Sequence, residues 1–327
     1  MKTLEHAHNH GVIDPSLLTS QRGIWAVKWS LIGLLVTAGI QLSIVAFSGS
    51  VGLLADGIHN VGDATTAIPL WVAFKLAQRQ PTKRFTYGYG RVEDVAGLIV
   101  LATILASAIT TLYLSIDRLL HPQKMDHLSW VIAASLIGFI GNEGVAIFRI
   151  KVGKEIGSAA LVADGHHART DGWTSLAVLV GVFGVWLGYP IADPLIGLFI
   201  TALILGVLWA SSKTIFTRLL DGIDPEIIDE LTAAIRHVPH VREITEVRVR
   251  WLGHRLRAEI NIAVDDKMPI EEAHAISEKV RLELLHHLQY LSHVTIHVDP
   301  LSISGEKHHH ADEVPRCAMK GSKSNEE

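Results

Sequence analysis

The sequence of 327 residues has little cysteine and little charge. Its single cysteine, Cys317, lies in a polar tail, so a disulfide within one chain and a thiolate metal site are both excluded. Asp, Glu, Lys and Arg make up only 19% of the residues, and the formal net charge of −4 points to no nucleic-acid partner. The N-terminus lacks a basic patch followed by a short apolar run, so we predict no cleaved signal peptide.

Long apolar blocks are what the sequence has instead. Hydrophobic residues make up 49% of the chain, and the mean hydropathy is +0.31. A helix needs roughly 20 mostly apolar residues to cross the hydrocarbon core of a membrane. Six stretches qualify, of which the second and fifth are the most polar: 24–47, 51–75, 92–116, 129–150, 157–187 and 191–214. They predict a membrane domain over residues 24–216, an all-α bundle of six transmembrane helices in a lipid bilayer.

Basic residues gather in alternate loops between these spans. They are Lys75, Arg79, Lys83, Arg84 and Arg91 after the second span, and Arg149, Lys151 and Lys154 after the fourth. The loops around Gly49 and Gly188 have none, and the loop around Pro122 has only Arg118 and Lys124. Because basic loops stay in the cytoplasm, we predict that both termini are cytoplasmic. The lack of targeting features favours a bacterial inner membrane.

After Leu220 the pattern becomes that of a soluble domain. The expected elements are a helix over 225–238, strands over 244–251 and 255–264, a helix over 270–288 and a strand over 294–298. This α-β-β-α-β order predicts a small cytoplasmic α+β sandwich over 217–303, with two helices on one face of a three-stranded sheet. A unit of about 80 residues is near the lower limit for an independent core, so we predict a homodimer. Polar, His-containing tails are expected over 1–23 and 304–327, and the second of them is expected to be disordered.

One motif occurs twice inside the apolar spans. Residues 53–63 and 161–171 both read Leu-x-Ala-Asp-Gly-x-His-x-x-x-Asp. The i, i+4 spacing puts the His and the last Asp of each copy on one helix face, one turn apart. If the two faces meet, they present four ligands: His59, Asp63, His167 and Asp171. Two imidazoles and two carboxylates suit tetrahedral zinc (Zn2+), and cadmium or cobalt could also be accepted.

Alternative roles stay open for these polar residues. A His–Asp pair can also hydrogen-bond across helices and only hold a bundle together, although two matching copies of a costly intramembrane motif favour function. Asp56 and Asp164 could belong to an ion or proton path, or could equally hydrogen-bond a neighbouring helix end. Glu143 could face a proton path. The clusters His6, His8, His10 and His308, His309, His310 could gather zinc loosely or have no role.

With these motifs the sequence resembles the cation diffusion facilitator family, from Trp25 to Pro300. Further landmarks are Gly49-Ser50-Val51, Tyr87-Gly88-Tyr89-Gly90-Arg91-Val92-Glu93 and Ala192-Asp193-Pro194. The resemblance implies six membrane helices, metal ligands on the second and fifth of them, and a ferredoxin-like cytoplasmic domain. It also implies export of metal from the cytoplasm in exchange for protons. The two histidines at the first ligand positions make zinc the expected metal.

The resemblance implies further sites outside the membrane. His274, His297 and Asp299 match ligands of a regulatory metal site in the cytoplasmic domain. Thr245 and Asn261 stand where other members have two more histidines, so at most one reduced site is expected. The alternative is a surface histidine and an aspartate that ends a strand. Arg91 and Asp221 resemble a charge interlock at the centre of the dimer, although each could be a solvated charge at a helix end. Some members have a further metal site in the loop between the second and third spans. Residues 83–89 of this sequence contain none of its ligands, so we expect the site to be absent.

Three other classes compete with a metal/proton antiporter. An intramembrane zinc metalloenzyme would need an open coordination position and a general base, often within His-Glu-x-x-His, which is missing here. A passive channel conflicts with a full tetrahedral ligand set, which would bind too tightly for fast conduction. A sensor with a mere membrane anchor would not need polar motifs inside its spans. We therefore expect a secondary transporter with alternating access, no enzymatic activity and no organic substrate.

Overall fold

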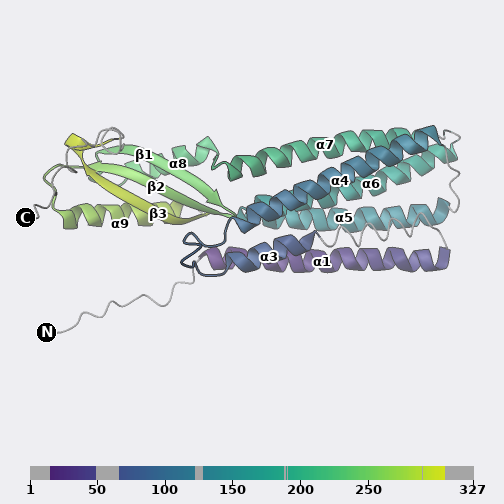
Figure 1. The fold of residues 1–327 in the computed structure, drawn as a ribbon, viewed down its shortest axis with the longest axis horizontal. Helices are drawn as coiled ribbons and strands as arrows, with labels where there is room; N and C mark the ends of the chain where they lie inside the picture. Colours follow the sequence, from purple (N-terminus) through teal and green to yellow (C-terminus); the bar gives the residue numbers. More distant parts are fainter. Residues whose placement is uncertain are drawn as a thin grey trace, which may run out of the picture. The chain divides into compact units, whose positions relative to one another are not determined.

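The computed structural model describes residues 15–48, 66–121, 128–187, 189, 191–288 and 290–305 (Figure 1). The chain divides into two compact units. The first lies within residues 1–222 and also includes 251–255. The second lies within 223–250 and 256–327.

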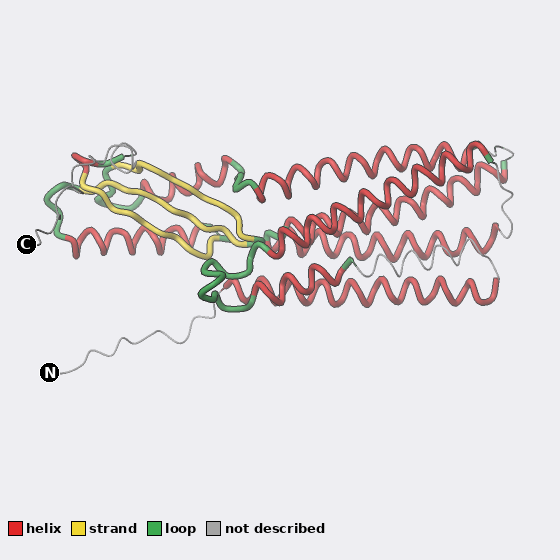
Figure 2. The backbone as a smooth tube through the Cα atoms, in the orientation of Figure 1, coloured by secondary structure: helices red, strands yellow, loops and turns green. Residues whose placement is uncertain are grey.

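Helices make up the first unit wherever the structure describes it, apart from their connections and residues 251–255 (Figure 2). They are α1 (Pro15–Ser48), α3 (Ala67–Ala77), α4 (Val92–Leu120), α5 (Leu128–Ile156), α6 (Ala159–Trp186) and α7 (Ala192–Leu219). Each falls on one of the six predicted spans, and α3 covers the end of the second, whose residues 51–65 lie outside the described part. The predicted membrane helix bundle is confirmed.

Among the described residues, four helices are long and apolar enough to cross a membrane: α1, α4, α5 and α7. The α6 helix is long enough, but its polar motif lowers its hydropathy, as the sequence indicated for the fifth span. Large apolar side chains such as Trp29, Phe199 and Trp209 are exposed on the outside of this unit. An apolar exterior of this kind belongs in lipid. The chain is therefore an integral membrane protein.

The interior of the first unit is formed by aliphatic and small side chains. Leu70, Phe74, Ile104 and Leu161 are fully buried in one cluster. Within this unit α5 packs along α6 and α1, while α4 packs along α7 and α6. The polar motif of α6 thus lies in the best-packed part of the bundle, between helices rather than against lipid.

The second unit has the predicted α-β-β-α-β order of a ferredoxin-like domain. Its elements are α8 (Pro225–Arg236), β1 (Glu243–Leu252), β2 (Arg255–Val264), α9 (Ile270–His287) and β3 (Leu291–Pro300), followed by a 3-10 turn, η1 (Leu301–Ile303). The sheet order is β1-β2-β3, and β2 pairs with β3 in parallel, with Ile260 opposite Ile296. The α8 and α9 helices contact each other, and α9 also contacts β3. The predicted element order is confirmed, and β3 extends beyond the predicted 294–298.

The turn between β1 and β2 belongs to the first unit. Gly253 has a φ of 63°, which suits glycine in a tight hairpin turn. The next residue, His254, is buried, and its Nδ1 lies 2.5 Å from Oε2 of Glu93 at the start of α4. Its Nε2 lies 3.1 Å from the Ser20 hydroxyl of α1. This buried contact joins the turn to two helices, and no motif in the sequence indicates it.

Candidate metal-transport site

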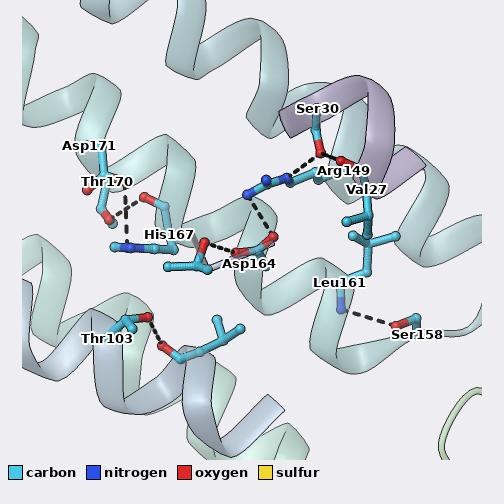
Figure 3. Close-up of polar contacts among 12 residues, drawn as sticks. Val27, Ser30, Thr103, Arg149, Ser158, Leu161, Asp164, His167, Thr170 and Asp171 are labelled. Atoms are coloured by element: carbon cyan, nitrogen blue, oxygen red, sulfur yellow. Dashed lines mark hydrogen bonds and ion pairs between the residues drawn. The ribbon is translucent and has the colours of Figure 1, made fainter. Parts of the chain in front are cut away.

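The α6 copy of the repeated motif lies inside the bundle. His167 and Asp171 are both almost fully buried, and Nδ1 of the imidazole lies 3.6 Å from Oδ2 of the carboxylate (Figure 3). The i, i+4 spacing places the two groups on one face of α6, because residues four apart are neighbours on a helix surface. A nitrogen and an oxygen donor thus adjoin each other in a site shielded from lipid and solvent.

The other copy of the motif lies outside the described residues. His59, Asp63 and Asp56 all belong to this part of the chain. The described chain resumes at Thr66, three residues after Asp63, and its hydroxyl donates a hydrogen bond of 3.1 Å to Oδ1 of Asp164. The first described residue of the second span therefore contacts α6 within the motif. Among the described residues, no group of three or more His, Cys, Asp or Glu side chains could hold a metal.

The first aspartate of the α6 motif is held by α5 and by the start of α3, and its partner on α5 is bonded to α1 in turn. Asp164 is fully buried, and its Oδ2 lies 2.7 Å from Nη1 of Arg149 on α5. Nε of Arg149 donates a hydrogen bond of 2.9 Å to the Ser30 hydroxyl on α1 (Figure 3). The other carboxylate oxygen of Asp164 accepts the hydrogen bond from Thr66, which stands at the N-cap position of α3. Of the two roles open for Asp164, the structure shows the bond to a neighbouring helix end, and adds an ion pair.

Arg149 is not a loop residue, contrary to the sequence-based prediction. Its charge predicts a place in the loop after the fourth span, among the basic residues that set the orientation of the protein. The structure places it inside α5, which continues to Ile156, and its side chain is only 1% exposed. Its charge is neutralised within the bundle by Asp164. Arg149 is therefore an intramembrane partner and does not contribute to the charge of a cytoplasmic loop.

A second ion pair joins α5 and α6. Glu143 of α5 accepts two hydrogen bonds from Nε of Arg169, of 3.1 and 3.2 Å, and one of 2.8 Å from its Nη2. The two side chains are partly buried, with 25% and 29% exposed. Arg169 lies in the sequence between the two candidate ligands of α6. The sequence leaves a proton path open for Glu143. The structure shows its carboxylate paired with the guanidinium group of Arg169.

The candidate ligands of the cytoplasmic domain are only partly brought together. Nε2 of His297 lies 2.9 Å from Oδ1 of Asp299 on β3, in keeping with the alternation of side chains along a strand. His274 lies on α9. The Thr245 hydroxyl donates a hydrogen bond of 3.3 Å to the carbonyl of Asn261, so the two positions without histidine are neighbours on β1 and β2. A regulatory metal site here stays a prediction.

The two charges expected at the dimer centre contact each other within one chain. Arg91 precedes α4, and its Nη2 donates to the carboxylate of Asp221, which follows α7. Nη1 of Arg91 also donates to the carbonyl of Arg218, at 3.2 Å, and lies 3.5 Å from Oδ2 of Asp94. Arg91 thus joins the ends of α4 and α7. Its place in a dimer stays a prediction.

Comparison with known families settles the class of the protein. The family model of the cation efflux transmembrane domain matches residues 27–220. The model of the cytoplasmic domain of cation efflux proteins matches residues 223–301. The chain belongs to the cation efflux family. It is therefore a transporter of the kind that carries divalent metal cations out of the cytoplasm, and it belongs to a family of transporters rather than of metalloenzymes.

Relatives extend across kingdoms. A probable cation efflux system protein of Mycobacterium tuberculosis is 49% identical over 316 residues, covering 91% of this chain and 95% of the relative. The magnetosome protein MamB of Paramagnetospirillum magneticum is 26% identical over 254 residues, covering 77% and 86%. Metal tolerance protein C1 of Arabidopsis thaliana is 27% identical over 289 residues, covering 81% and 61%. These matches include both units, so the cation efflux protein is similar to its relatives in domain organisation as well as in its membrane part.

Proposed function

We propose that this cation efflux protein exports zinc from the cytoplasm in exchange for protons. The cargo would bind a tetrahedral site of two imidazoles and two carboxylates: His59, Asp63, His167 and Asp171. The observation that supports it most is the buried His167–Asp171 pair on α6, together with the second copy of its motif at 53–63. Nitrogen and oxygen donors of this kind bind zinc at about 2.0–2.2 Å. Cadmium and cobalt are the expected competitors.

Proton exchange follows from the chemistry of these ligands. A metal binds only the deprotonated forms of imidazole and carboxylate, so its binding releases protons and its affinity depends on pH. Histidine in water titrates near pH 6.5, within the range of a cellular proton gradient. In an alternating-access cycle, the four groups would therefore hold zinc when they face the cytoplasm and give it up to protons on the other side.

The direction of export depends on the orientation in the membrane. The connection between α3 and α4 carries Arg79, Lys83 and Arg84, and all three are exposed. The positive-inside rule then puts this connection, and with it both termini, in the cytoplasm. The bacterial relative supports an inner-membrane location. We further propose a homodimer through the cytoplasmic domain, with His274, His297 and Asp299 as a reduced regulatory site.

Purified protein in liposomes tests both parts of the proposal. With an acidic interior, wild-type protein should drive zinc uptake, recorded by a zinc-sensitive dye inside the vesicles, and collapsing the gradient should stop it. Zinc uptake at the same rate with and without the pH gradient would exclude antiport. Cadmium and cobalt, added in competition, rank the metals.

Variants locate the site. Asp171→Asn and His167→Ala should reduce uptake to the level of empty liposomes. His287→Ala is the matched control, because His287 forms an i, i+4 contact of 3.5 Å with Glu283 that is exposed on α9. Wild-type transport by Asp171→Asn would refute the assignment of the ligands.

A further inference from the structure

The α5 and α6 helices form a hairpin with two ion pairs across it. They run antiparallel because only Gly157 and Ser158 separate them, and Gly157 has a φ of 74°. In one pair the cation belongs to α5, where Arg149 faces Asp164. In the other the cation belongs to α6, where Arg169 faces Glu143. The polarity of the two pairs is therefore opposite.

Opposite polarity fixes the register of the two helices. Arg149 is six positions after Glu143, which is about 9 Å along a helix axis. A slide of α6 along α5 in one direction would bring Asp164 toward Glu143. A slide in the other direction would bring Arg169 toward Arg149. Either movement separates both ion pairs and places like charges together in a medium that screens them poorly, so each alternative register is penalised.

Glycines also bring the two backbones into contact. A Cβ atom added at Gly165 of α6 would lie 2.9 Å from the backbone nitrogen of Ile150. One added at Gly153 of α5 would lie 2.9 Å from the backbone nitrogen of Val162. Small residues that allow such an approach are typical of firmly packed membrane helices. The added Cβ atoms would also lie 2.7 Å from Cγ1 of Ile150 and 2.8 Å from Cγ2 of Val162, so the seam leaves little space for a relative movement of the two helices.

We propose that Arg149, Asp164, Glu143 and Arg169 keep α5 and α6 in one register throughout transport, and that they are positioning residues for the ligands of α6. This inference rests on the proposed function. His167 lies three residues after Asp164 and two before Arg169 along α6, between the two residues that form the ion pairs (Figure 3 shows the first pair). Its position is therefore fixed relative to α5.

A disulfide across the seam tests rigidity directly. A Cβ atom at Gly172 would lie 3.5 Å from Cβ of Asn142, which is within the range of disulfides. The variant is Asn142→Cys with Gly172→Cys, in a Cys317→Ser background. We expect the cysteines to couple under mild oxidation, and the oxidised and reduced proteins to take up zinc at rates within about twofold. Failure to couple, or uptake that stops on oxidation and returns on reduction, would overturn the proposal.

Charge reversal tests the positioning role. Arg169→Glu places two carboxylates together, so we expect the KM for zinc to rise by about 10–100-fold, as for other residues that support metal ligands. Glu143→Arg with Arg169→Glu restores an ion pair across the seam. This double variant should recover a KM within about threefold of wild type. A purely structural role would reduce the amount of folded protein and the maximal rate, and leave KM unchanged.

Stability separates this proposal from the proposed function. The thermal midpoint of purified protein should fall in Arg169→Glu and recover in the double variant, whether or not zinc is transported. A wild-type protein that takes up no zinc would refute the proposed function. Loss of the recovery in the double variant would refute the register argument alone.

Discussion

The two units use ion pairs of equal length in different ways. Nη1 of Arg149 lies 2.7 Å from Asp164 in the membrane unit, and Nη2 of Arg281 lies 2.7 Å from Glu278 on α9 in the cytoplasmic unit. The first pair is 1% and 0% exposed, the second 42% and 43%. Water competes for and screens the second pair but not the first. The same distance therefore corresponds to different energies.

The difference teaches what each pair is for. An exposed pair can lose one partner at little cost, because water solvates the other. A buried pair cannot, since the remaining charge would be left in a poorly polarisable interior. Buried pairs add little net stability over apolar residues of similar volume, but they do select one arrangement of their helices. The Arg149–Asp164 pair is thus better explained by the register of α5 and α6 than by stability.

The largest effect is expected from Arg149→Ala, which removes one partner of the buried ion pair. Asp164 would keep a charge without a cation, so the free energy of unfolding should fall by about 3–5 kcal/mol. Chemical unfolding of the purified protein in detergent measures it. Replacement of both partners, Arg149→Met with Asp164→Leu, should recover most of the loss. A loss below about 1 kcal/mol for Arg149→Ala would mean that the pair behaves like a surface pair.

A smaller loss is expected from Gly165→Ala. The added methyl group would lie 2.7 Å from Cγ1 and 2.9 Å from the backbone nitrogen of Ile150, so α5 and α6 must separate. Overpacking of this kind costs about 1–3 kcal/mol. Gly144→Ala is the matched control on α5, because nothing lies within 4 Å of its added Cβ. Equal unfolding free energies for the two variants would contradict the close seam.

Much of this architecture could be predicted from the sequence. Apolar blocks of membrane-spanning length place the helices, and the period of 3.6 residues places His167 and Asp171 on one face of α6. The alternation of apolar residues and turn signals likewise places the elements of the cytoplasmic domain. These are local properties, in which each residue is interpreted with its near neighbours in the chain.

The ion pairs across α5 and α6 could not be predicted in the same way. A charged residue lowers the local hydropathy, so the predicted span stops near Arg149. The helix itself continues for two further turns, to Ile156. Its charge is tolerated only because Asp164 lies opposite, and that partner is fifteen residues away in the sequence. One signal was available. In a helical hairpin with its turn at Gly157, residues nearly equidistant from the turn face each other, which pairs Arg149 with Asp164.

A much smaller effect is expected from the exposed pair of Arg281 and Glu278. The hydrogen bond from Arg281 holds the pKa of Glu278 below its usual range, and burial works against it. Glu278→Gln removes the charge of an i, i+3 helix pair, which is worth about 0.3–0.5 kcal/mol. The unfolding free energy should therefore change by no more than this, and the change should shrink in high salt. A loss of unfolding free energy as large as that expected for Arg149→Ala would mean that exposed and buried ion pairs do not differ in this protein.

The smallest effect is a pH dependence in the cytoplasmic unit. Partial burial, with the nearby cations of Arg257 and Arg281, lowers the pKa of His293 on β3. The folded protein then binds this proton less tightly than the unfolded chain, whose histidine titrates near pH 6.5. The contribution of His293 to the free energy of unfolding is therefore complete above about pH 6.5. It decreases as the pH falls toward the lowered pKa. Thermal midpoints of wild type and His293→Gln should show a constant difference at pH 7.5 and above. At pH 5.5 the wild type should lose more than the variant, whereas a wild type that loses less on acidification would contradict the direction of the shift.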